Sequence, residues 1–124
     1  MGSIAFAVPV KPGKTADAEK LTEMLTKEQA PGHHETSRSH GAKRIKIYHQ
    51  ERPSEQMVIY IESDDIPTAM KNRAASDHEF DQWFGKMIEE ITGYHPDQHF
   101  HEPPSQLLVD WHEEKGHSAR AEHR

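Results

Sequence analysis

Four short segments of this chain alternate apolar residues with small or polar ones, and this pattern restricts the possible fold more than any other feature. They span 3–10, 44–50, 56–62 and 106–112. Successive side chains of a strand point to opposite faces of a sheet, so a two-residue period predicts strands with one apolar face. A hairpin loop, 51–55, is predicted between the second and third strands.

Two amphipathic helices are predicted between these strands. The first covers about 15–27, and the second has the clearest helical period in the chain. The apolar side chains of the second helix are Phe80, Trp83, Phe84, Met87, Ile88 and Ile91. Ser76 and Glu79 predict a capping box at its start, and Gly93 predicts its end. Shorter helices are expected over 33–40 and after a cap at Asp64 or Asp65.

The order of elements is strand, helix, strand, strand, helix, strand. This order predicts an α+β domain of the ferredoxin-like βαββαβ type, with a four-stranded antiparallel sheet. Right-handed crossovers would put both helices on one face of the sheet. A chain of 124 residues suits a single domain, which we place at 1–112. Residues 113–124 are charged and poor in apolar side chains, so a flexible C-terminal tail is expected there.

Composition excludes several classes of partner and chemistry. The chain has no cysteine, which rules out disulfides and thiolate chemistry. Its net charge is −6, and the densest basic cluster is only Lys43, Arg44 and Lys46, so no nucleic-acid partner is expected. No apolar run is long enough to span a bilayer, and residues 1–10 do not resemble a signal peptide, so we expect a cytoplasmic protein without a membrane partner.

The two faces of the predicted sheet differ in character. The apolar face should pack on the helices and comprises Ile4, Phe6, Val8, Ile45, Ile47, Met57, Ile59, Ile61, Leu107, Val109 and Trp111. The mixed face comprises Ser3, Ala5, Ala7, Arg44, Lys46, Tyr48, Val58, Tyr60, Glu62, Leu108, Asp110 and His112. A face of this kind is either solvated, as is usual for an antiparallel sheet, or the wall of a binding pocket.

If the mixed face is a pocket wall, its ionisable groups are the candidate site. A carboxylate beside a tyrosine can move a proton at neutral pH when burial tunes its pKa, and a basic side chain can hold an anionic group. The candidate catalytic residues are therefore Tyr48, Tyr60 and Asp110. The candidate substrate-binding residues are Arg44, Lys46, Glu62 and His112.

No metal or cofactor site is predicted. The chain has eleven histidines, but no pair within a predicted helix has the spacing of metal ligands together with a suitable carboxylate. The glycines are isolated, so no phosphate-binding loop is present. Ser37 and His40 place a hydroxyl near an imidazole, yet the sequence supplies no third member of a hydrolase triad.

Three segments resemble a family of short, uncharacterised bacterial proteins. They are 4–9, 75–84 and 107–111, and the family in turn resembles the dimeric α+β barrel superfamily. The resemblance implies a homodimer in which two sheets close a barrel. Members of that superfamily include cofactor-free monooxygenases, isomerases, cyclases and haem-handling proteins, so the fold does not fix the chemistry. No known catalytic residue set transfers to this chain.

These observations together predict a homodimer that binds a small organic molecule between its sheet and its partner. If it is an enzyme, it is a cofactor-free acid–base or oxygenation catalyst. A non-catalytic dimeric interaction module is the alternative, and haem or metal handling is the third possibility. The sequence does not decide whether the protein is an enzyme.

Overall fold

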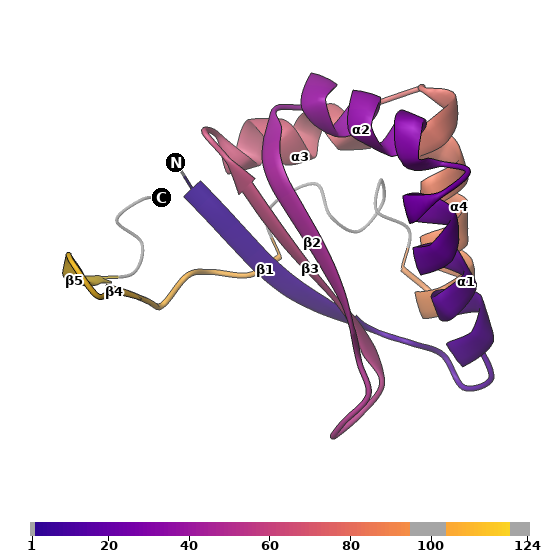
Figure 1. Ribbon diagram of the computed structural model, residues 1–124, viewed down its shortest axis with the longest axis horizontal. Helices are drawn as coiled ribbons and strands as arrows, with labels where there is room; N and C mark the ends of the chain where they lie inside the picture. Colours follow the sequence, from indigo (N-terminus) through magenta and orange to yellow (C-terminus); the bar gives the residue numbers. More distant parts are fainter. Residues whose placement is uncertain (1, 95–103, 120–124) are drawn as a thin grey trace.

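The computed structural model describes residues 2–94 and 104–119 (Figure 1). Five strands and four helices occur in these ranges. The strands are β1 (Gly2–Pro9), β2 (Ala42–Gln50), β3 (Gln56–Ser63), β4 (Val109–His112) and β5 (Gly116–Ala119). The helices are α1 (Thr15–Thr26), α2 (Ala30–Ser39), α3 (Ile66–Ala74) and α4 (Glu79–Thr92).

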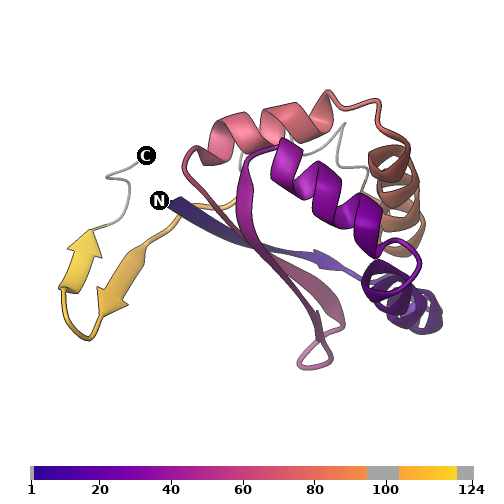
Figure 2. The same cartoon turned by 45° about the horizontal axis from the view of Figure 1, so that its top comes forward.

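The main sheet is antiparallel and has the order β1-β3-β2. Burial alternates along β3, where Met57, Ile59 and Ile61 are buried and the residues between them are only half-buried. The helices lie on one side of this sheet, and the opposite face carries no helix of the described chain (Figures 1 and 2). The predicted α+β class is therefore confirmed, and so is the apolar face as far as β1, β2 and β3 form it, because the strand period set the side on which the helices pack. Leu107, Val109 and Trp111 were assigned to the same face, and this is wrong, since all three are exposed outside the main sheet.

The fourth strand does not lie where the sequence predicted it. Segment 106–112 was expected to extend the main sheet, but the described part of that sheet has three strands. The hydroxyl of Ser105 donates to the Ala5 carbonyl at the β1 edge, and the chain then leaves that edge. Strand β4 pairs instead with β5, through a turn in which Gly116 takes a φ of 75°. Glycine adopts this conformation without strain, so the hairpin closes here.

Strand β5 lies within the segment expected to be a flexible tail. Residues 116–119 pair with β4 in register from Val109↔Ala119 to His112↔Gly116. The remainder of the expected tail, 120–124, lies outside the described residues. The charged residues 113–117 therefore form the turn and the start of the second strand of a hairpin.

The helix caps follow the sequence in one case and differ in another. Asp65 caps α3 as predicted, because its carboxylate accepts the backbone N–H of Thr68 at 3.1 Å. The capping box predicted at Ser76 is wrong, since α4 begins at Glu79 and its cap is His78. His78 Nδ1 accepts the backbone N–H of Phe80 at 3.0 Å, while Ser76 accepts from His78 at 3.1 Å.

Two groups of buried apolar side chains pack between the helices and the sheet. The larger joins α1 and α4 to the sheet around Leu21, Met57 and Ile88. The smaller packs α3 on Ile4, Ile59 and Ile61. Trp83 is only partly buried at the border of the larger group, although its spacing placed it in the predicted apolar stripe.

Candidate functional site

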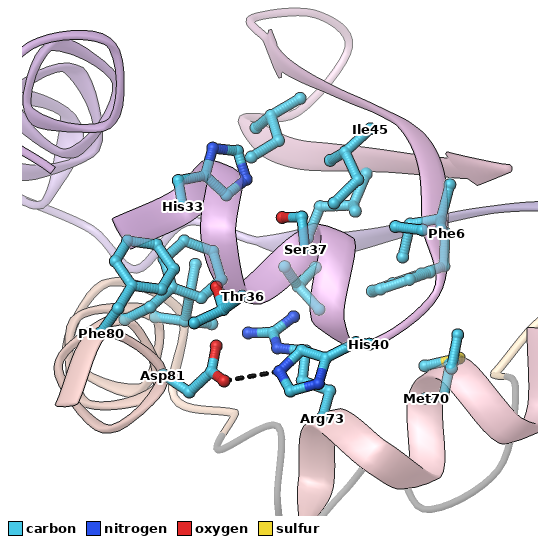
Figure 3. Close-up of a pocket in the computed structure, with 18 residues that line it drawn as sticks. Phe6, His33, Thr36, Ser37, His40, Ile45, Met70, Arg73, Phe80 and Asp81 are labelled. Carbon is cyan, nitrogen blue, oxygen red and sulfur yellow. Dashed lines mark hydrogen bonds and ion pairs between the residues drawn. The ribbon is translucent and has the colours of Figure 1, made fainter. Parts of the chain in front are cut away.

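A cavity of about 80 Å³ lies between the main sheet and helices α2, α3 and α4. Its sheet wall is entirely apolar and comprises Phe6, Val8, Ala42, Ile45, Ile47, Ile59 and Ile61. Polar side chains line it from the helices: His33, Thr36, Ser37, His40, Arg73 and Asp81 (Figure 3). An apolar hollow with a few converging polar groups is the usual form of a small-molecule site.

His40 and Asp81 form a buried pair at the polar side of this cavity. His40 Nε2 lies 2.6 Å from Asp81 Oδ2, and the exposed fractions of the two side chains are 13% and 5% (Figure 3). His40 follows the last residue of α2, and Asp81 lies in the first turn of α4, so two helix ends bring them together. They are separated by 41 positions in the sequence.

The hydrogen bond determines which nitrogen of His40 can act as a base. An ionised carboxylate only accepts hydrogen bonds, so Nε2 must carry a proton when Asp81 is ionised. In the neutral imidazole this leaves Nδ1 with a free lone pair, and the carboxylate stabilises the imidazolium that forms when Nδ1 takes a proton. The pair is therefore arranged as an oriented general base.

Ser37 lies one turn before His40 on α2 and also lines the cavity. Among the described residues, no hydrogen bond joins its hydroxyl to His40. The sequence offered no third member for a Ser37–His40 set, and the structure adds Asp81 as the partner of the imidazole. A serine nucleophile would need a hydrogen bond from its hydroxyl to the imidazole, and Ser37 makes none to His40. The arrangement is therefore an acid–base pair with a hydroxyl nearby, and it is not a catalytic triad.

Arg73 and His33 complete the polar side of the cavity. The Arg73 guanidinium carbon lies 4.7 Å from the centre of the Phe84 ring, which is cation–π distance. The His33 ring stacks on Phe80 with the ring centres 5.6 Å apart. Burial lowers the pKa of the His33 imidazole below its ordinary value of 6.5, and the positive charge of Arg73 lowers this pKa further.

The shifted pKa of His33 predicts a loss of stability in acid. The folded protein disfavours the charged form of this imidazole, so it takes up a proton at a lower pH than the unfolded chain, which does so near pH 6.5. The unfolded state therefore binds more protons, and stability falls as the pH drops below about 6.5. We expect His33→Gln to give a shallower decrease of melting temperature between pH about 7.5 and about 5.5 than the parent chain. Parallel slopes for the two proteins, measured by differential scanning calorimetry, would contradict this.

Five residues of the site predicted from sequence lie on the outer face of the sheet, which is the face turned away from the helices: Arg44, Lys46, Tyr48, Tyr60 and Glu62. The Tyr60 hydroxyl donates to Glu62 at 2.6 Å, and this hydrogen bond raises the pKa of Tyr60 above its ordinary 10.0. Lys46 Nζ lies 5.8 Å from the Tyr60 ring centre, and Arg44 is the register partner of Glu62. Tyr48 is on the same strand as Lys46 but is 54% exposed.

The other two predicted site residues lie elsewhere. Asp110 and His112 are in β4, and both are exposed on the hairpin that it forms with β5. The structure thus groups Arg44, Lys46, Tyr60 and Glu62 and leaves Asp110 and His112 on a separate two-stranded sheet.

Sequence reasoning missed the cavity residues His40, Asp81 and Arg73 as a group. One signal was available: Asp81 and Gly85 are both buried, and they share one side of α4 with the apolar stripe. A carboxylate and a glycine on the packed side of a helix indicate a buried polar partner and a close approach. The partner itself could not be found, because the sequence does not reveal which helix end faces Asp81.

Comparison with known proteins gives no family assignment. Searches against protein-family models, curated proteins and solved structures found no match to this chain. Within residues 2–94 and 104–119, no group of three or more histidine or acidic side chains is placed to hold a metal ion. His95, His99 and His101 lie outside these ranges. Among the helices described, none has the length and apolar content needed to cross a membrane.

Proposed function

We propose that this protein binds a small organic molecule in the cavity beneath helices α2, α3 and α4 and that His40 moves a proton on it. The observation that carries this proposal is the His40–Asp81 pair, held at 2.6 Å beside a cavity whose sheet wall is wholly apolar. Placing an ionisable carboxylate and an imidazole away from water has a free-energy cost that an apolar core avoids. A carboxylate that orients an imidazole beside a cavity is the arrangement a general base requires.

The size and charge of the cavity limit the substrate class. Its volume, about 80 Å³, is roughly half that of a ~150 Å³ cavity that accepts benzene. The ligand is therefore a short chain, or a single ring if the flexible Met70 side chain at the wall moves to admit it. Arg73 supplies a positive charge for the anion left when His40 removes a proton from an acidic O–H or C–H group. Proton transfer of this kind leads to isomerisation, or to oxygenation when the anion reacts with dioxygen.

Phenol and benzene are matched probes of this site. Both are flat and small, but only phenol offers a proton to His40. We expect phenol to bind at least tenfold more tightly than benzene, since a hydrogen bond to a buried partner contributes about 1.4 kcal/mol. His40→Ala should remove this preference, and because it enlarges the cavity, benzene should bind at least as tightly as to the parent chain. Tyr48→Phe on the outer face is the control and should preserve it.

Chemical-shift perturbation by NMR gives both affinities and the location of the bound probe. Shifts confined to residues on the outer face would contradict the cavity as the site. Equal affinities of the parent chain for phenol and benzene would contradict the role of His40.

We also propose that two copies associate through the outer face of the sheet, as a ferredoxin-like chain does in a dimeric α+β barrel. Support comes from that face itself, where Ala5 and Ala7 are exposed beside the half-buried Val58 and Tyr60. A second sheet would remove this apolar surface from water. It would also enclose Tyr60 and Glu62, so the site predicted from sequence would become a second polar cavity at the interface.

Ala7→Arg tests the proposed dimer. The added side chain would carry an unpaired charge into the interface, so dissociation to monomers is expected at micromolar concentration. Multi-angle light scattering gives the mass of both proteins. A parent chain that is monomeric at about 100 μM, or an Ala7→Arg protein that stays fully dimeric, would contradict the proposal.

A non-catalytic dimeric module is the second candidate function. The observation that favours it is the exposed apolar surface of the β4–β5 hairpin, which is typical of an interaction surface. In that case the cavity is only a packing defect, and neither phenol nor benzene binds measurably. Haem handling is the third candidate, and a Soret shift on titration with haemin would support it.

A further inference from the structure

The segment after the cavity-forming body carries unusually exposed apolar side chains. Residues 105–119, here called the arm, include the β4–β5 hairpin. The exposed fractions are 44% for Leu107, 62% for Leu108, 64% for Val109 and 60% for Trp111. Consecutive exposed apolar residues mark an interaction site, whereas single ones are ordinary on protein surfaces.

The arm lacks the support that a hairpin of this length needs. Two strands of four residues are marginally stable in water unless a third strand or another layer covers them. In the described chain, β4 pairs with β5 and with no strand of the main sheet. Figures 1 and 2 show the hairpin standing away from the main sheet, on the side opposite the helices.

We propose that the arm packs on the outer sheet face of a second copy of this chain. The inference rests on the proposed dimer and names the element that completes its interface. The chain leaves its own sheet at Ser105, which is bonded to the β1 edge at Ala5. The hairpin that follows is therefore directed outward from the molecule that carries it.

The outer face offers the surface that the arm requires. Ala5 and Ala7 are exposed, small and on the edge strand β1, so at the border of the paired sheets they leave room for large side chains such as Trp111. Tyr48 adds an aromatic ring that is 54% exposed at the far strand. Aromatic side chains placed over small residues make well-packed interface centres.

The charges of the arm and the outer face are complementary. The face carries Arg44 and Lys46, both exposed, against the half-buried Glu62, so its basic groups outnumber its acidic one. The arm carries exposed Asp110, Glu113 and Glu114 against the single exposed base Lys115, so its acidic groups are in excess. Opposite charges around an apolar centre fix the register of an interface and favour this pairing over others. A two-fold axis would let each arm cover the face of the other copy, which closes the assembly at two copies.

Disulfide trapping tests the arrangement, because the chain has no cysteine of its own. Val109→Cys is prepared in one chain and Ala7→Cys in a second chain that carries a mass tag. After mixing and mild oxidation, we expect a disulfide that joins the tagged to the untagged chain. Gln82→Cys, exposed on α4, replaces Ala7→Cys as the control and should not be trapped. A chain that carries both substitutions and forms the disulfide within itself at high dilution would show that the arm packs on its own sheet, and this would overturn the proposal.

Association constants separate the arm from the dimer as a whole. Leu108→Asp combined with Trp111→Asp should weaken dimerisation at least 100-fold, measured by sedimentation equilibrium. Gln82→Asp adds a charge to the helical side and should leave the constant unchanged. A dimer that persists at the original strength in the doubly substituted arm would overturn the arm proposal while leaving the sheet-face dimer intact. A monomeric parent chain would overturn both.

Discussion

Replacing Phe84 with alanine is expected to lower the free energy of unfolding by about 4 kcal/mol. The Phe84 side chain is 6% exposed and stacks on Phe80 with the ring centres 5.8 Å apart. It also lies beneath the Arg73 guanidinium and lines the cavity. The substitution removes the ring from the core and enlarges a hollow that the surrounding helices cannot close.

Trp83→Ala is the matched comparison within the same helix. Trp83 is larger, but it is only partly buried at the border of the core. We therefore expect a smaller loss than for Phe84→Ala. Urea denaturation followed by far-UV circular dichroism gives both values, and an unchanged m-value shows that the denatured state is the same. A larger loss for Trp83→Ala would mean that α4 is rotated from the position described.

The helical and strand periods identified most of the fold. Helix α4 and strand β3 were predicted within a few residues, because their apolar side chains repeat at the spacing that buries one face. The same alternation assigned Met57, Ile59 and Ile61 to the helix side, where they are buried. Patterns of this kind depend only on residues that are close in the chain, so they can be recognised in a single sequence.

The last strand shows where local patterns are insufficient. Segment 106–112 alternates as an edge strand would, yet β4 pairs with β5. The choice between an open edge on β1 and a hairpin depends on the turn at Gly116 and on distant partners. The two-residue period predicts neither of these, because it shows on which face of a sheet a side chain lies and does not show with which strand the segment pairs.

The candidate site was the part of the molecule that the sequence predicted least well. The mixed strand face was chosen as the site because its polar residues stand out in the alternating pattern of the strands. The cavity on the helix side was hidden, since its polar groups come from the ends of α2 and α4 and from α3. His40 and Asp81 are remote in sequence, and only the packing angle of the helices brings them to 2.6 Å.

Replacing Asp81 with leucine is expected to destabilise the protein by about 3 kcal/mol. The His40 side chain is 13% exposed, so the imidazole would lose its acceptor without gaining full access to water. Much of this loss should come from the unpaired His40 rather than from the missing carboxylate. The double variant His40→Leu with Asp81→Leu should then recover to within about 1 kcal/mol of the parent chain, because an apolar pair of similar volume avoids the cost of burying charge.

The double variant separates folding from function. A pair that apolar residues can replace without loss of stability is not needed for folding, which supports a chemical role for it. We expect the double variant to fold, to bind benzene, and to lose the preference for phenol. If it instead remains as unstable as Asp81→Leu alone, the pair is a structural element that joins α2 to α4. If it keeps the preference for phenol, the proton acceptor lies elsewhere in the cavity, and Ser37 becomes the group to replace next.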